Sequence, residues 1–141
     1  MKLEDQVCSL DLAKQLKSLG AKQESVFFWN YDERGTAPKL TKGRMLRTQS
    51  TGSPTWWDVS AFTVTELLNQ IPKIIEGHNP DKDNPHNPSY LRIFTDECIA
   101  WCVAHSGIEY QLYVDNSDDE NLANVMAGML IHLIEKGIVK I

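Results

Sequence analysis

The chain has 141 residues, of which 42% are hydrophobic and 23% are charged, and its formal net charge is −5 at pH 7. These values fit one globular domain that buries a core without disulfides or metals. They exclude a membrane-spanning helix, because every apolar run is too short to cross a bilayer. The acidic balance also argues against a general affinity for nucleic acid, since phosphate binding needs cations.

The N-terminus and the cysteines indicate the compartment. The first 20 residues mix charges throughout and contain no continuous apolar run, so we expect no secretory signal. The three cysteines, Cys8, Cys98 and Cys102, have no framework spacing, which is typical of reduced thiols. We therefore expect a cytoplasmic protein.

The first predicted element is a short amphipathic helix over residues 9–19. Ser9 is a good N-cap and Gly20 a good stop. Between them, apolar side chains recur with helical spacing at Leu10, Ala13, Leu16 and Leu19. The polar face, with Asp11, Lys14 and Lys17, indicates no chemistry.

Two strands and a tryptophan pair are expected next. Residues 26–31 are rich in aromatic side chains, which favours a strand followed by a turn. We interpret these rings as core packing, with a ligand-stacking platform as the alternative. The return strand is expected at residues 44–48. Trp56 and Trp57 follow on a strand, where adjacent side chains point to opposite faces, so at least one is expected to be exposed or to cover a partner surface.

A second helix is predicted over residues 64–70. Thr63 and Glu66 form a capping box, and the helix must end before Pro72. Ile74 and Ile75 resemble the start of a strand. Residues 76–89 consist mostly of Asn, Asp, Pro, His and Gly, which predicts a long polar loop that is either functional or mobile.

The last third of the chain predicts three short strands and a long helix. The strands are expected at residues 90–94, 97–105 and 108–114, and the second belongs in the middle of the sheet because both its faces are apolar. Ser117 and Glu120 form a capping box for the C-terminal helix, and Gly137 suits its left-handed cap. The apolar stripe of this helix comprises Leu122, Val125, Met126, Met129, Leu130, Leu133 and Ile134.

These elements predict one α+β domain over residues 1–141. It has an antiparallel sheet of four to five strands, with the long C-terminal helix packed on one face and two shorter helices.

The best candidate for a metal site lies in the polar loop. Its side chains are imidazoles and carboxylates, which zinc accepts, and they come from His78, Asp81, Asp83 and His86. A solvated loop explains the same residues, since Asn and Pro fill the intervals. The sequence has no phosphate-binding glycine loop, serine elbow or two-histidine zinc helix, so we predict no cofactor.

A cysteine site is a weaker alternative. Cys98, Cys102 and His105 would share one face of a helix, but the β-branched and aromatic neighbours favour a strand. On a strand the two cysteines are about 13 Å apart, so we interpret them as buried and unreactive. The acidic cluster before the last helix is explained by helix capping.

One stretch is basic despite the acidic total. Residues 34–47 contain five cationic side chains and no Asp or Glu. The cations are Arg34, Lys39, Lys42, Arg44 and Arg47. A solvated hairpin explains them, and a contact with phosphate or an acidic partner is the alternative.

Several blocks of this sequence resemble a known group of proteins. These are the helix LAKQLKSLG at residues 12–20, the aromatic strand SVFFW at 25–29, the segment AFTVTELL at 61–68 that ends in Pro72, and the helix from LANVMAGMLI at 122–131 through EKGI at 135–138. They are similar to blocks of small phage- and prophage-encoded proteins of Gram-positive and Bacteroidetes genomes, from which this chain departs in its longer 76–89 loop. The group is uncharacterised, so the resemblance implies a mobile-element origin and a small α+β domain, and no activity.

The functional hypothesis rests on the four tryptophans, since tryptophan is enriched at binding hot spots. We expect a non-enzymatic protein–protein interaction module that binds an unknown protein partner, or itself as a homodimer, through Trp56 or Trp57. A nucleic-acid-associated phage protein that uses the basic stretch is the alternative. A small metal-dependent or cysteine enzyme is a further one.

Overall fold

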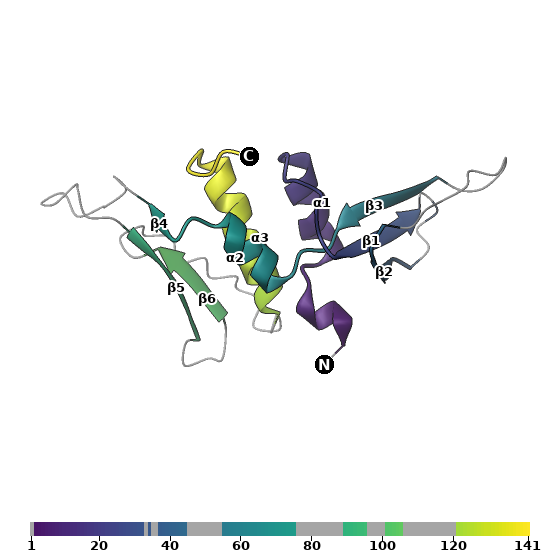
Figure 1. Ribbon diagram of the computed structural model, residues 1–141, viewed down its shortest axis with the longest axis horizontal. Coiled ribbons are helices and arrows are strands. Elements are labelled where there is room, and N and C mark those ends of the chain that lie inside the picture. The colour runs from purple at the N-terminus through teal and green to yellow at the C-terminus, as the bar shows by residue number, and fades with distance from the viewer. Residues whose placement is uncertain are drawn as a thin grey trace, which may run out of the picture.

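The computed structural model describes residues 2–32, 34, 37–44, 55–75, 89–95, 101–105 and 121–141. In this part of the chain, two three-stranded antiparallel sheets lie at opposite ends of the molecule, and the helices lie between them (Figure 1). The α+β class is therefore confirmed. The single sheet of four to five strands is not confirmed, because the helical layer separates the strands of the two halves.

The first sheet has the order β2-β1-β3. β1 (Phe27–Asp32) is central, and both β2 (Lys39–Lys42) and β3 (Trp56–Ser60) pair with it in antiparallel fashion. The return strand therefore comes earlier than the predicted residues 44–48, of which all but Arg44 lie outside the described residues. Leu40 supplies the half-buried apolar contact, and Gly43, with φ +74°, follows the strand directly.

The second sheet has the order β4-β5-β6. The backbones of β4 (Ile74–Ile75), β5 (Ser89–Thr95) and β6 (Trp101–His105) pair in antiparallel fashion. Among the described strands β5 lies between β4 and β6. The predicted central position of the strand at residues 97–105 depends on its neighbour at residues 108–114, so it stays a prediction. The expected neighbour at residues 108–114 and residues 76–88 of the predicted 76–89 loop lie outside the described residues. Ser89, predicted as the last residue of that loop, instead begins β5.

The two shorter helices begin where their predicted caps place them. Ser9 caps α1 (Leu10–Ser18), and Thr63 and Glu66 form the capping box of α2 (Val64–Gln70). A short 3-10 helix, η1 (Leu3–Gln6), precedes α1.

The C-terminal helix α3 (Leu122–Glu135) starts later than predicted. Its N-cap is Asn121, whose side-chain oxygen accepts a hydrogen bond from the Ala123 amide at 2.9 Å. The predicted capping box at Ser117 and Glu120 is therefore wrong, and both residues lie outside the described part. At its C-terminus Gly137 adopts φ +70° as expected, and the Ile138 amide donates to the Leu133 carbonyl, which closes a Schellman motif.

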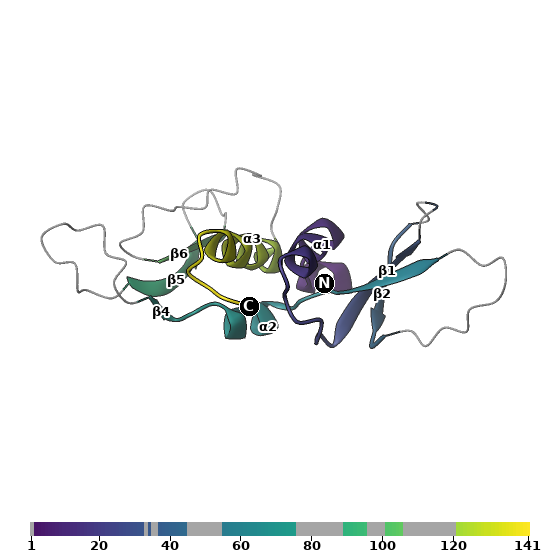
Figure 2. The same ribbon diagram turned by 90° about the horizontal axis from the view of Figure 1, so that it is seen from above.

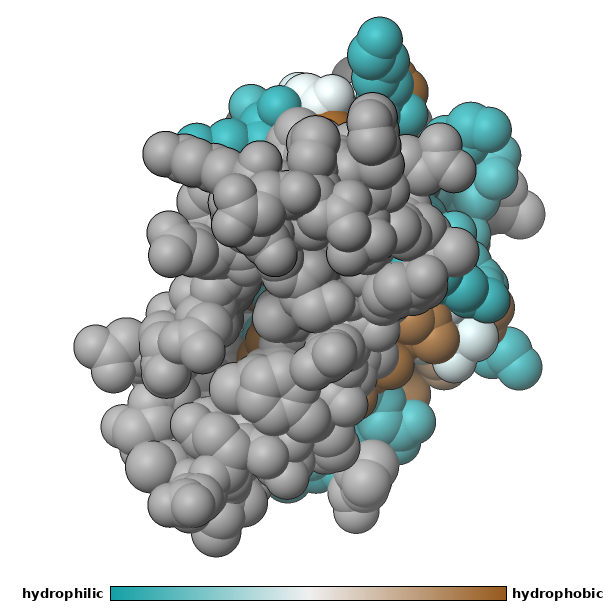
Figure 3. All heavy atoms as spheres, turned by 90° about the vertical axis from the view of Figure 1, so that its left-hand side faces the viewer, coloured by the Kyte–Doolittle hydropathy of each residue, from teal (hydrophilic) through white to brown (hydrophobic). Residues whose placement is uncertain are grey.

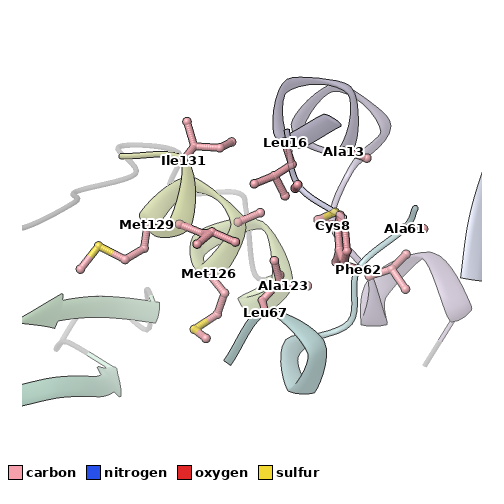
Figure 4. Close-up of a cluster of buried hydrophobic side chains, with 14 of the residues drawn as sticks. Cys8, Ala13, Leu16, Ala61, Phe62, Leu67, Ala123, Met126, Met129 and Ile131 are labelled. Carbon is pink, nitrogen blue, oxygen red and sulfur yellow. The ribbon is translucent and has the colours of Figure 1, made fainter. Parts of the chain in front are cut away.

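The core lies in the helical layer. α3 contacts α1, α2 and β6, so it lies at the centre of the described part of the molecule. The predicted packing of this helix on one sheet face stays a prediction. Side chains of the three helices gather there with those of Cys8, Ala61 and Phe62 (Figure 4). Leu16, Phe62 and Met126 are among the largest side chains that are fully buried.

No helix in the described part of the chain is both long and apolar enough to span a membrane.

The first sheet extends from the helical layer beside α1, on the side opposite the second sheet (Figure 2).

Candidate functional site

The candidate site is an aromatic pair near the C-terminal end of β1 and the N-terminal end of β3. Trp57 pairs with Tyr31 across the two strands, and 45% of the Trp57 side chain is exposed. Trp56, on the other face of the sheet, is half-buried. The prediction that at least one of the two tryptophans is exposed is therefore confirmed. The large hydrophobic residues exposed in the described part of the chain are Val26, Trp57 and Ile141.

Helix α1 places two lysines beside this aromatic pair. The Nζ atom of Lys14 lies 4.2 Å from the centre of the Tyr31 ring, close enough for a cation–π interaction. Lys17 donates from Nζ to the carbonyl oxygen of Asp58, the neighbour of Trp57, at 3.2 Å. We call Tyr31, Trp57, Lys14 and Lys17 the aromatic–lysine surface. Partial burial raises the pKa of the Tyr31 hydroxyl, so the ring carries no charge at neutral pH.

A rigid support lies behind this surface. Trp29 and Val59 form the next rung of the sheet on the same face, and both are buried. The indole Nε1 of Trp29 donates to the carbonyl oxygen of Cys8 at 2.9 Å, which fixes the ring against the core. Trp57 therefore stands on an ordered strand, and little conformational entropy is lost when a partner covers it.

The opposite face of the first sheet carries buried polar groups. The Asn30 amide donates to Thr41 Oγ1 at 2.6 Å and to the Phe28 carbonyl oxygen at 3.3 Å. The hydroxyl of Ser60 is buried and makes no hydrogen bond. A nucleophile needs a neighbouring base within hydrogen-bond reach, and Ser60 Oγ lacks one. Among the described residues of this face, the Asn30 bonds hold β1 and β2 together, and Ser60 has no base to activate it.

The metal hypothesis stays a prediction. His78, Asp81, Asp83 and His86 lie outside the described residues. Within the described ranges, no three His, Cys, Asp or Glu side chains come close enough together to hold a metal ion.

The cysteine site would need its side chains on one face of a helix, and the structure does not place Cys102 and His105 on a helix. Cys102 and His105 lie on β6, in the strand conformation that the sequence favours, and Cys98 lies outside the described residues. Cys8 is fully buried, and its burial raises the thiol pKa from 9.0 to about 12, so it is a core side chain and not a nucleophile.

The basic stretch is divided by the fold. Lys39 and Lys42 are exposed on β2, and Arg34 is exposed just after β1. Arg44 instead lies over the Phe28 ring at 5.3 Å and donates from its guanidinium to the Gln23 carbonyl oxygen at 2.7 Å. Arg47 lies outside the described residues.

The sequence interpretation missed three members of the aromatic–lysine surface. Lys14 and Lys17 form one i, i+3 pair on the polar face of α1, which indicated no chemistry before the packing of that helix was known. Tyr31 was assigned to the core with its neighbours. Its position at the end of the aromatic run was the available signal.

From the end that carries the second sheet, the described residues in view are mostly hydrophilic, with a smaller hydrophobic area beside them (Figure 3).

No protein-family model, no curated protein and no solved structure matches this chain, so the functional argument rests on its own residues.

Proposed function

We propose that this protein is a non-enzymatic protein–protein interaction module that binds through the aromatic–lysine surface. The observation that carries the proposal is the exposure of Trp57 on an ordered strand, next to a second aromatic ring. Tryptophan and tyrosine anchor protein interfaces because they bury a large area at a small entropic cost. A cytoplasmic location and a phage or prophage origin belong to the same proposal, and they rest on sequence composition and resemblance.

The size of the exposed ring sets the expected contribution. About 100 Å² of Trp57 remains available for burial, given 150–250 Å² for a fully buried aromatic side chain. At about 25 cal/mol per Å², covering it stabilises a complex by about 2–3 kcal/mol. Removing the ring should then weaken binding by a factor of about 30 to 140.

The experiment combines light scattering, tryptophan quenching and site-specific cross-linking. A photo-reactive phenylalanine in place of Trp57, which keeps an aromatic ring at that position, captures the partner, and the same group in place of Val26 is the matched control, since Val26 is also exposed, at 52%. The captured protein is then purified and its affinity is measured for the wild type, Trp57→Ala and Val26→Ala. We expect only Trp57→Ala to weaken binding.

The same measurements identify a homodimer. If the partner is a second copy, light scattering gives twice the chain mass and Trp57→Ala gives the monomer. Equal affinities of Trp57→Ala and the wild type, in a monomer whose Trp57 stays freely quenched, would refute the proposed surface.

A second candidate is single-stranded nucleic acid. Exposed rings beside cations stack on bases and contact phosphates, and the first sheet offers both. The net charge of −5 opposes this candidate. It is tested by binding of a fluorescent twelve-nucleotide thymidine oligomer, for which an affinity that does not fall with added salt would exclude phosphate contacts.

A further inference from the structure

The two outer edges of the first sheet differ in whether side chains bind their outward backbone groups. On β3, the outward amide of Ser60 donates to Gln23 Oε1 at 2.9 Å, and the outward carbonyl of Asp58 accepts from Lys17 Nζ at 3.2 Å. Side chains from α1 and from the segment after it therefore occupy the backbone groups that another strand would use. This edge is closed to strand addition.

Among the described residues, the edge at β2 is open. The Gly43 amide donates to the Val26 carbonyl oxygen at 2.8 Å, so residues 39, 41 and 43 direct their backbone groups toward β1. Leu40 and Lys42 consequently direct theirs away from β1. In the part of the chain that the structure describes, no hydrogen bond occupies these outward groups.

We propose that the β2 edge binds an extended acidic segment of a partner protein, which adds to the sheet as a fourth strand. The proposal rests on the proposed role as an interaction module and assigns it a second surface. Strand addition to an open sheet edge is a common mode of peptide recognition, in which the backbone supplies affinity and the side chains supply specificity.

The charges on β2 select the occupant. Lys39 and Lys42 are exposed, and neither forms an ion pair within the described ranges. Opposite charges across a strand pair stabilise it, and like charges directly opposite destabilise it. Two copies of this edge would bring lysines together, so the lysines that guard against self-pairing also favour an acidic partner.

The register predicts the pattern of that partner. Lys39 and Lys42 are three residues apart and so lie on opposite faces of the strand. An added strand therefore meets both cations when its two acidic residues are also three apart. A partner with acids two apart meets only one of them.

The probe is the acetylated and amidated peptide Thr-Val-Glu-Val-Thr-Glu-Val-Thr, and the readout is amide hydrogen exchange by NMR. In the free protein the amides of Leu40 and Lys42 face away from β1 and should exchange rapidly. We expect saturating peptide to slow their exchange at least tenfold. The Thr41 amide is the internal control, since its bond to β1 already protects it.

Two control peptides test the charge pattern. The first replaces both Glu by Lys, and the second places the two Glu two residues apart. We expect the first to give no protection and the second to bind several-fold more weakly than the probe. Equal protection by all three peptides would overturn the acidic specificity.

Variants then locate the site. Lys39→Glu combined with Lys42→Glu should weaken binding more than tenfold, and Lys39→Gln with Lys42→Gln repeats the test if the reversed charges disturb folding. The matched control is Lys22→Glu with Lys140→Glu, which changes the net charge equally at two exposed positions.

The outcomes separate the possible occupants. Failure of the acidic peptide to protect Leu40 and Lys42 overturns the proposal, and so does protection by a thymidine oligomer in its place. Concentration-dependent protection of these amides without peptide would identify a second copy as the occupant and would also overturn it. Trp57→Ala should leave the peptide affinity unchanged. If the peptide binds at β2 but Trp57→Ala changes the affinity for no partner, only the proposal of the aromatic–lysine surface is refuted.

Discussion

Glu66 joins two parts of the fold through one carboxylate. Its Oε2 accepts hydrogen bonds from the Thr63 amide at 2.7 Å, from the Thr63 hydroxyl at 3.0 Å and from the Ser25 hydroxyl at 2.9 Å. Its Oε1 accepts from the Val26 amide at 3.0 Å. The carboxylate therefore caps α2 and also holds the segment that leads into β1. Replacing it should destabilise both.

The expected loss follows from these contacts. A capping side chain contributes about 1 kcal/mol, and each hydrogen bond to the segment before β1 contributes about 1 kcal/mol. Glu66→Ala should therefore lower the free energy of unfolding by about 3 kcal/mol. Glu66→Gln keeps one oxygen for the Thr63 and Ser25 donors but sets an NH₂ group against the Val26 amide, so it should cost about 1–2 kcal/mol.

The assay is equilibrium unfolding in urea, followed by tryptophan fluorescence. With a slope of about 2 kcal/mol per molar urea, Glu66→Ala should move the midpoint down by about 1.5 M. Glu135→Ala is the control, because Glu135 is exposed in the last turn of α3 and should change stability by less than about 0.5 kcal/mol. Glu66→Ala values below about 1 kcal/mol, or equal to the control, would refute the reasoning.

Three further predictions concern the core and its links. Trp29→Phe removes the indole donor from the buried Cys8 carbonyl and should cost about 1–3 kcal/mol in urea unfolding. Burial raises the pKa of the Cys8 thiol from 9.0 to about 12. As the pH rises above 9, the thiol therefore ionises in the unfolded chain but stays protonated in the folded one, which favours unfolding. Wild-type stability should fall by about 1 kcal/mol more than that of Cys8→Ala between pH 8 and pH 10, and parallel curves would contradict this cause. Asn124→Ala removes the Oδ1 acceptor of the Ser9 amide, at 2.7 Å, and should cost about 1–2 kcal/mol by thermal unfolding, whereas Asn124→Asp keeps the acceptor and should cost less.

Local signals predicted the starts of the two shorter helices. Ser9 and the Thr63–Glu66 box act on amides within three residues of themselves, so the sequence window contains the whole interaction. The start of α3 was predicted wrongly because Asn121 is selected by distant contacts. Its amide also donates to the carbonyl oxygen of Val7 at 2.8 Å, which no local window contains.

The candidate site was predicted in part for the same reason. Alternation along a strand predicts that one of Trp56 and Trp57 is exposed, but it does not decide which one. That depends on which side chains of other elements pack against each face, which is a tertiary arrangement, and in the fold Trp57 is the exposed residue. The division into two sheets depends on the helical layer between them, which is a tertiary arrangement and not a property of any strand.

The hydrogen bonds between the N-terminal segment and α3 also determine when this protein can fold. Asn121 and Asn124 hold backbone groups of Val7 and Ser9 across more than a hundred intervening residues. During synthesis, α1 and the first sheet leave the ribosome well before the helix that covers Leu16 and Phe62. Long-range contacts of this kind form slowly. Until α3 is made, the apolar surface that it covers stays exposed, and exposed apolar surface favours aggregation and proteolysis. A chain interrupted before α3 should therefore be degraded, and a chain that includes α3 should become protease-resistant only after this helix docks.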